Sequence, residues 1–360
     1  MQRELSLYLD LVRITSAMVV FLAHATGVSG GLFAQLWEYS FFSTAVTIFF
    51  VLSGYVIGYV SSNKETCIED YTVARFARLY SVIIPALILT LICGAITIRF
   101  NGPFSDKIQS LSYLEHLVRY LLTLINLQHI WFIDKTPGLN GPFWSLSNEF
   151  IYYCLFAVIF YLRDYKRIFL AMLFMLLGGP MIVLTFPIWM MGYYTYKIHQ
   201  SNRQLLTNTK IGASISILSL IVLIIVSPLI KSKGYLVIDV SFFPRTEILT
   251  KYVDAISFTL HLMFIHTLLP YIGSVLRYFS KSIQWSASLS FSLYLFHLPL
   301  ITTVPLLYYE DKSALSSRLI LYGITLIIVA TLGHWCERNK YKLKLIVSPF
   351  IYRLYKSNRK

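Results

Sequence analysis

The segment ITSAMVVFLAHATGVSGGLFAQLW, residues 14–37, decides the class of protein to which this chain belongs. It has no charged residue and one histidine (His24), and it is longer than the roughly 20 predominantly apolar residues that cross a bilayer as a helix. The whole chain shares this character, with 56% hydrophobic and 13% charged residues. About a quarter of residues are charged in soluble proteins. The sequence therefore predicts a polytopic membrane protein.

Further uncharged stretches of span length follow along the chain. They cover residues 39–63, 79–98, 168–196, 211–230, 255–276, 282–309 and 319–336. Residues 144–162 form a weaker candidate. Residues 113–127 contain Glu115 and Arg119, so we expect an interfacial or re-entrant segment there instead of a span.

The basic loops set the expected orientation, because Lys and Arg accumulate on the cytoplasmic side. They gather at residues 61–78, 163–167, 197–210 and 277–281 and from Arg338 onward. Both ends of residues 168–196 then lie inside, which predicts a helical hairpin that turns at residues 178–180, Gly-Gly-Pro. The prediction is an all-α transmembrane bundle of about ten spans with both termini cytoplasmic, residues 1–340 as the membrane domain and 341–360 as a basic cytoplasmic tail.

This orientation places four basic residues outside, against the rule: Lys231, Lys233, Arg245 and Lys251. The net charge of +14 would suggest nucleic acid in a soluble domain, but here the basic residues mostly lie between apolar runs. We therefore expect orientation signals and phosphate contacts, and no nucleic-acid partner. The four cysteines are scattered, so neither a disulfide framework nor a metal site is expected.

Ionisable residues inside spans are costly and mark functional candidates. Arg13 and His24 are eleven residues apart in one predicted helix, which places both on one face about 16 Å apart along the axis. Asp10 shares that face and is expected to pair with Arg13 or orient it. A snorkelling arginine and a hydrogen-bonded core histidine are the structural alternatives.

Two motifs follow in the next predicted spans. FFVLSGY, residues 49–55, contains a Ser-Gly pair that permits close helix approach. RFARLY, residues 75–80, places Arg75 and Arg78 on one face of an expected helix start, where guanidinium groups and the helix dipole favour phosphate. A positive-inside anchor is the alternative for these arginines.

Two later motifs carry polar groups into the membrane. GPFWSLSNEF, residues 141–150, contains Trp144, Ser147 and Glu149, and the carboxylate needs a partner, for which a histidine is the obvious candidate. An interfacial Trp, a capping Ser and a first-turn Glu are the structural alternative. SFSLYLFHLP, residues 290–299, places Tyr294 and His297 on one helical face, which more commonly indicates a structural hydrogen bond.

Together, these motifs resemble the acyltransferase 3 family of integral membrane acyltransferases, which O-acylate cell-surface glycans and related molecules. The resemblance runs from Leu9 to about Glu337, and the ordered set of motifs carries it. The chain departs from the family where Ser81 follows Tyr80 and proline comes only at Pro85. Tyr55 and Phe291 also replace the more usual Phe and Tyr.

The resemblance implies that Arg13 and His24 are required for activity and that an acyl-CoA, usually acetyl-CoA, is the donor. We expect Arg13, Arg75 and Arg78 to bind the donor phosphates. His24 would act as a general base or as a nucleophile, with Glu149 orienting its imidazole. Trp144, Ser147, Tyr294 and His297 are the expected substrate contacts, and Ser147 is a candidate donor to the oxyanion.

The expected acceptor is a hydroxyl of a bacterial surface polysaccharide, such as O-antigen or capsule, or of its lipid-linked precursor. The expected location is the cytoplasmic (inner) membrane, with lipids as further partners. Two alternatives stay open. One is a transporter of an acylated or anionic small molecule, and the other is an acyltransferase with a small-molecule acceptor. Release of free CoA that depends on His24 would separate the enzyme from the transporter.

Overall fold

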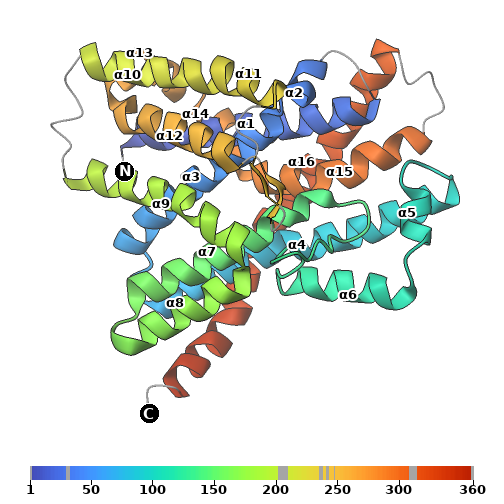
Figure 1. Cartoon of the computed structure of the whole chain (residues 1–360), viewed down its shortest axis with the longest axis horizontal. Coiled ribbons are helices and arrows are strands. Elements are labelled where there is room, and N and C mark those ends of the chain that lie inside the picture. Colours follow the sequence, from blue (N-terminus) through green and yellow to red (C-terminus); the bar gives the residue numbers. More distant parts are fainter. Residues whose placement is uncertain are drawn as a thin grey trace. The chain divides into compact units, whose positions relative to one another are not determined.

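The structure, a computed structural model, describes residues 2–29, 33–201, 210–234, 238–240, 243–246, 248–307 and 314–357. Helices dominate these residues, which confirms the predicted all-α class (Figure 1). A short antiparallel pair, β1 (Ile238–Val240) and β2 (Phe243–Thr246), is the strand structure of the described part. The chain divides into two compact units, which we describe separately.

The first unit comprises most of residues 1–63 and residues 185–287. Its helices are α1 (Arg3–Ser29), α2 (Ala34–Glu38), α3 (Phe41–Asn63), α9 (Pro180–Ser201) from Thr185 onward, α10 (Lys210–Ile221), the π-helical turn η2 (Val222–Val226), α11 (Ser227–Ser232), α12 (Ile248–Phe264), the 3₁₀ turn η3 (Ile265–Thr267), α13 (Leu269–Tyr278) and α14 (Ser280–Ser288). α12 packs against α3 and runs alongside α10, η2 and α11 (Figure 1).

Helices α3 and α9 approach each other closely at two glycines. A Cβ atom at Gly54 would lie 1.9 Å from the carbonyl oxygen of Trp189, and one at Gly192 would lie 1.8 Å from that of Val51. One residue further along α3, the Tyr55 hydroxyl hydrogen-bonds Nδ1 of His199 at 2.9 Å. FFVLSGY is therefore a helix-packing motif, as its Ser-Gly pair predicted.

The first unit also buries a charge that the orientation prediction had placed in an outer loop. Nζ of Lys231 lies 2.5 Å from Asp254 and 2.6 Å from the Thr44 hydroxyl, and the side chains of the ion pair are 0% exposed. The prediction that Lys231 lies in a loop was wrong, because it belongs to α11, where Asp254 neutralises its charge. The side of the membrane on which it lies stays a prediction. The side chain of Arg245 lies outside the described residues.

The second unit comprises residues 64–184 and 288–360, together with residues 28–31. Its helices are α4 (Ile68–Arg99), α5 (Ser105–Gln109), α6 (Tyr113–Leu124), the 3₁₀ turn η1 (Gly141–Phe143), α7 (Trp144–Tyr161), α8 (Asp164–Gly178), α15 (Ser290–Leu307) and α16 (Leu315–Ser357). α4, α15 and α16 pack against one another.

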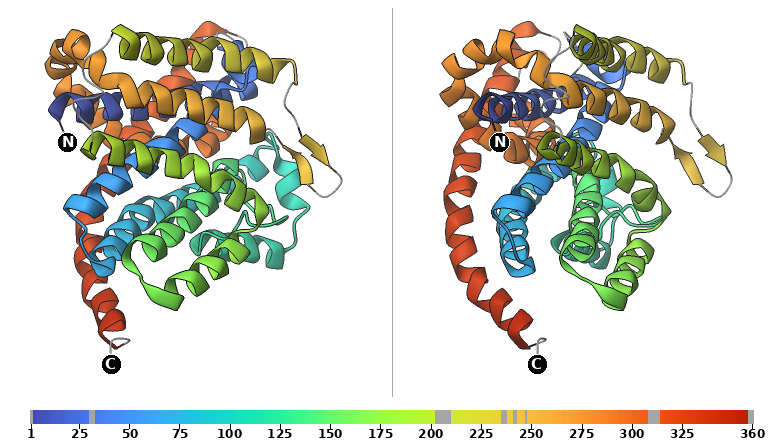
Figure 2. Two further views of the ribbon diagram at one scale, coloured as in Figure 1. Left: turned by 60° about the vertical axis from the view of Figure 1, so that its left-hand side comes forward. Right: turned by 90° about the vertical axis from the view of Figure 1, so that its left-hand side faces the viewer.

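The long α16 contains both the last predicted span and most of the predicted tail. It continues as one helix past residue 340, and Figure 2 shows its gentle curve. Its C-terminal part packs on the start of α4, where Tyr355 hydrogen-bonds Thr72 at 3.3 Å. The basic tail is thus helical and docked as far as the structure describes it.

Eight helices of the described residues are long and apolar enough to cross a membrane. The chain also breaks between α8 and α9, which bend by 118° where Gly179 has a φ of +80°. Glycine suits this point, because a Cβ there would lie 3.0 Å from the backbone of Trp131. The predicted turn at residues 178–180 is confirmed. The expected number of ten spans counts α8 and α9 as two spans. The cytoplasmic location of both termini stays a prediction.

Residues 113–127 do not form a span. α6 has 12 residues, about 18 Å of helix, which is shorter than the hydrocarbon core of about 30 Å. Its leucines 114, 117 and 121 are exposed, whereas Glu115 and Arg119 turn inward and pair with each other at 3.2 Å. The end of α6 reaches the spanning part of α4, because the Tyr80 hydroxyl donates to Leu124 O at 2.6 Å. These contacts favour the re-entrant alternative.

Candidate active site

Arg13 and His24 lie on the single helix α1, as predicted. Nη1 of Arg13 lies 3.3 Å from Asp10, and both side chains are about one-fifth exposed. The expected pairing with Asp10 is therefore present. A partly exposed guanidinium beside one carboxylate can still reach a phosphate, because Arg has five donors.

The ring of His24 is held by its own helix and by aromatic neighbours. Nδ1 lies 2.8 Å from the carbonyl oxygen of Val20, and the ring centroid lies 5.7 Å from that of Trp37 and 5.4 Å from that of Phe42. A carbonyl oxygen only accepts, so Nδ1 carries the proton and Nε2 the lone pair of the neutral ring. This tautomer suits a base or a nucleophile at Nε2.

Arg75 and Arg78 do not lie at a helix start. α4 begins at Ile68 with Glu69 and Asp70 in its first turn. Arg75 lies about two turns and Arg78 nearly three turns further on, beyond the first turn in which the helix dipole acts. The prediction of a dipole-assisted phosphate site is wrong in this respect. The motif RFARLY does not mark the beginning of α4, because the acidic first turn of the helix precedes it.

The two arginines also differ in their surroundings. Nη2 of Arg75 lies 2.6 Å from Glu65, and its guanidinium lies over the rings of Tyr71 and Tyr153 at 5.5 and 5.7 Å. Arg78 forms no ion pair with any residue that the structure describes. Arg78 is thus the better placed of the two to take an anion.

Glu149 accepts a hydrogen bond from the Tyr153 hydroxyl, one turn further along α7. The guanidinium of Arg75 lies 5.7 Å from the centroid of the same Tyr153 ring. The second unit therefore brings Glu149 and Arg75 together around Tyr153. His24 belongs to the other unit, so its pairing with Glu149 stays a prediction.

The expected substrate contacts all lie in the second unit, around the start of α7 and in α15. Trp144 is half-buried, and its ring lies 5.8 Å from that of His129. Ser147 is fully buried and accepts from the backbone N–H of His129 at 3.1 Å. Its role as an oxyanion donor is untested, and the contact seen here secures the preceding loop.

Tyr294 and His297 lie together in the interior, with ring centroids 6.2 Å apart. Tyr294 hydrogen-bonds the Ser145 hydroxyl at 2.8 Å, which ties α15 to α7. Nδ1 of His297 donates to Leu293 O at 2.9 Å. The structural hydrogen bonds allowed for in this motif are present, and a contact with substrate is untested.

Sequence reasoning missed Tyr153 and Ser145. Tyr153 follows Glu149 by four residues, the spacing at which two side chains meet on a helix, and this signal could have identified it. Ser145 became recognisable only when α15 was placed against α7.

The fold and the site define a polytopic membrane protein with a histidine, arginines and a glutamate inside its helical units. The sequence model of the family described as "Acyltransferase domain" matches residues 6–335. The chain therefore belongs to this family of acyltransferases, which confirms the resemblance seen in the motifs.

Two relatives agree with this assignment. The "O-acetyl transferase" of Shigella phage Sf6 is 28% identical over 172 residues, which cover 46% of this chain and 49% of that protein. "Acyltransferase MdmB" of Streptomyces mycarofaciens is 33% identical over 118 residues, which cover 32% of this chain and 28% of that protein. The chain thus spans about half or less of the relatives it matches. No solved structure matches it.

Proposed function

We propose that this protein is a membrane O-acyltransferase that moves an acetyl or larger acyl group from acyl-CoA to a hydroxyl of a surface glycan or its lipid-linked precursor. The single observation that carries the proposal is the tautomer of His24, with Nδ1 bound to Val20 O, in a chain of an acyltransferase family. The phage relative, named as an O-acetyl transferase, supports acetyl as the group.

The reaction follows from these groups. Arg78 and Arg13 bind the donor phosphates, and the thioester reaches the region of His24. Nε2 of His24 takes the proton of the acceptor hydroxyl, and the hydroxyl oxygen attacks the carbonyl carbon of the thioester. The C–S bond breaks, and the CoA thiolate leaves and takes up the proton. A covalent acyl-imidazole is the alternative route.

In this proposal Glu149 orients the imidazole of His24 and stabilises its protonated form. The site of action in this proposal is the bacterial cytoplasmic membrane, with the donor on its inner side. No metal enters the reaction as proposed.

The test compares His24→Ala and Arg13→Ala with the wild-type protein in membranes. Acetyl-CoA-dependent release of CoA is measured, together with the O-acetyl signal of the surface glycan by NMR. Both should be lost in the variants, while the protein still accumulates. His334→Ala is the control, because His334 is an exposed histidine of α16. Retained CoA release in the His24 variant would reject the proposal.

A further inference from the structure

A non-helical segment, residues 125–140, lies beside the spanning part of α4. It begins after Leu124, whose carbonyl oxygen accepts from Tyr80, and ends at Asn140, whose Nδ2 donates to the Thr90 hydroxyl at 3.0 Å. Tyr80 and Thr90 both belong to the uncharged stretch of α4. Non-helical backbone at membrane depth persists only inside protein or along a water-filled cavity. The segment therefore calls for a reason beyond connecting α6 to α7.

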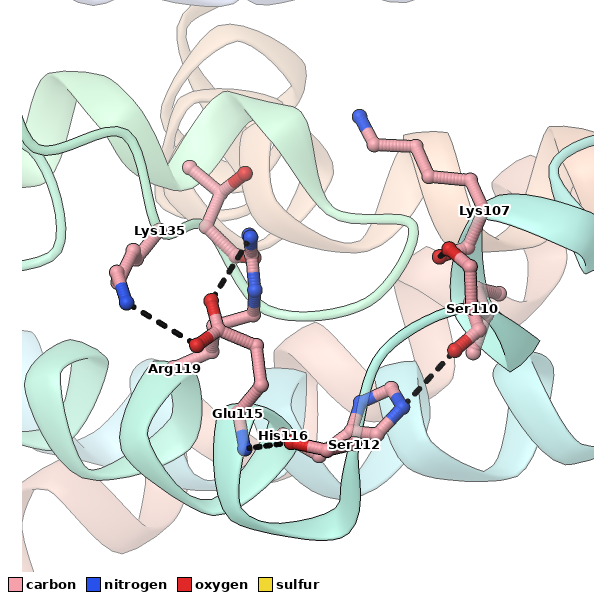
Figure 3. Close-up of polar contacts among 9 residues, drawn as sticks. Lys107, Ser110, Ser112, Glu115, His116, Arg119 and Lys135 are labelled. Carbon is pink, nitrogen blue, oxygen red and sulfur yellow. Dashed lines mark hydrogen bonds and ion pairs between the residues drawn. The ribbon is translucent and has the colours of Figure 1, made fainter.

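Ion pairs and hydrogen bonds hold this segment in place. Figure 3 shows Glu115 of α6 between Arg119 and Lys135, and Nζ of Lys135 lies 3.1 Å from Glu115. Nη1 of Arg119 donates to Thr136 O at 3.1 Å, and Lys135 N donates to Gln128 O at 2.8 Å. The charged side of α6 thus faces residues 125–140 and holds them in one conformation.

Two amide side chains flank the turn η1 at the start of α7. Nε2 of Gln128 donates to Phe143 O at 2.5 Å, and Nδ2 of Asn140 donates to Leu295 O at 2.8 Å. A carbonyl oxygen cannot donate, so both amides must present their NH₂ groups to these partners. Their orientation is fixed by chemistry and does not depend on how oxygen and nitrogen were assigned.

The carbonyl oxygens of both amides are left as acceptors. Gln128 and Asn140 are 0% exposed, and no donor from the described part of the chain reaches Oε1 of Gln128 or Oδ1 of Asn140. Buried acceptors in native proteins almost always have a donor. These two oxygens are therefore able to accept hydrogen bonds from a group that enters the protein.

We propose that Gln128 and Asn140 bind hydroxyl groups of the glycan acceptor, an inference that rests on the proposed acyltransferase function. Hydroxyls are neutral donors that suit amide carbonyls. The half-buried Trp144 begins α7 directly after Phe143, whose carbonyl oxygen accepts from Gln128, and an aromatic side chain of this kind suits the apolar face of a sugar ring. Gln128 and Asn140 are therefore acceptor-binding residues, distinct from the arginines proposed for the donor.

Asn126 supplies a matched control. It is also 0% exposed and leaves its oxygen without a donor from the described residues, but its NH₂ group faces the Tyr80 hydroxyl at 3.4 Å. The Tyr80 hydroxyl has one hydrogen, which it donates to Leu124 O, but it could donate to Oδ1 of a turned Asn126 instead, so a donor for this oxygen lies within the described chain. Loss of Asn126 should therefore weaken packing without affecting the acceptor.

The experiment uses membrane vesicles of cells that make the surface glycan, with radiolabelled acetyl-CoA as the probe. Label transfer to the glycan is measured against acetyl-CoA concentration for Gln128→Ala, Asn140→Ser and Asn126→Leu, normalised to the amount of protein. Asn140→Ser removes the amide carbonyl and retains a small polar side chain with a donor, so it disturbs the buried position less than alanine would.

The Gln128 and Asn140 variants should lose at least tenfold in maximal transfer rate, with half-saturating acetyl-CoA unchanged within twofold. Asn126→Leu should stay within threefold of wild type. Normal rates in the first two variants, an equal loss in Asn126→Leu, or a rise in half-saturating acetyl-CoA would overturn the inference. Failure of the wild-type protein to transfer label would instead reject the proposed function itself.

Discussion

Lys231 and Asp254 form an ion pair of 2.5 Å between α11 and α12, with both side chains fully buried. Ser227 donates to the second carboxylate oxygen, and the Thr44 hydroxyl accepts from Lys231. Three helices of the first unit therefore meet at one charged cluster. Phe42, which packs on His24, lies two residues before Thr44 in α3. The pair thus fixes the first turn of the helix that contributes to the His24 site.

Lys231→Met should destabilise the protein by about 3–5 kcal/mol, because it leaves a buried carboxylate without its cation. The double variant Lys231→Met/Asp254→Asn should regain most of the lost folded protein, since no charge then stays unpaired. Folded yield and thermal aggregation in detergent measure both effects. Lys233→Met, at an exposed neighbouring lysine, is the control. A double variant no better than the single one would contradict this account.

Gly54→Ala and Gly192→Ala should each reduce the folded protein strongly. The added methyl group would overlap a backbone carbonyl oxygen of the opposite helix, which cannot turn aside as a flexible side chain can. Overpacking of this kind costs about 1–3 kcal/mol or more. Gly94→Ala in α4 is the matched control, because nothing lies within 4 Å of its added methyl. Equal yields of all three variants would refute the close approach of α3 and α9.

Arg75 and Arg78 should give different phenotypes. Arg75→Met leaves Glu65 without its cation and should lower accumulation, which Glu65→Gln in the same chain should restore. Arg78→Gln should accumulate normally and raise half-saturating acyl-CoA at least tenfold, because Arg78 is the arginine without a carboxylate partner among the described residues. Donor titration of each variant in membranes is the measurement. An unchanged donor dependence for Arg78→Gln would show that it is only an anchor.

The ion pairs of Glu115 should make the segment of residues 125–140 sensitive to acid. The hydrogen bond from Lys135, followed by the charges of Lys135 and Arg119, lowers the pKa of Glu115. A lowered folded pKa means that this stabilisation is complete above the ordinary carboxyl pKa of about 4.3 and is lost as pH falls through the folded value. Protection of residues 128–136 from hydrogen exchange should therefore be constant from pH 7 to 5 and fall below pH 4.

Glu115→Gln should show the low-pH exchange already at pH 7, because the amide cannot attract both cations. Asp106→Asn in α5 is a control that removes an acidic residue from outside this cluster. Wild-type protection in the Glu115 variant at pH 7 would contradict the role of the ion pairs in fixing the segment.

The sequence by itself determined the membrane class, the family and the continuous helix that carries Arg13 and His24. These follow from local properties: uninterrupted apolar runs must be helical in a bilayer, and spacing along one helix fixes which side chains share a face. The turn at residues 178–180 and the packing role of Gly54 were predicted for the same reason, since each depends on a few adjacent residues.

The tertiary structure decided which charges are already neutralised and which polar groups are buried without donors. Lys231 is paired because Asp254, 23 residues later, reaches it from another helix. Arg75 is neutralised by Glu65 from the loop before its helix, and Tyr153 joins Arg75 to Glu149 across two helices. Burial and ion pairing depend on contacts between segments far apart in the chain. Apolar periodicity, in contrast, depends only on residues that are neighbours in the sequence.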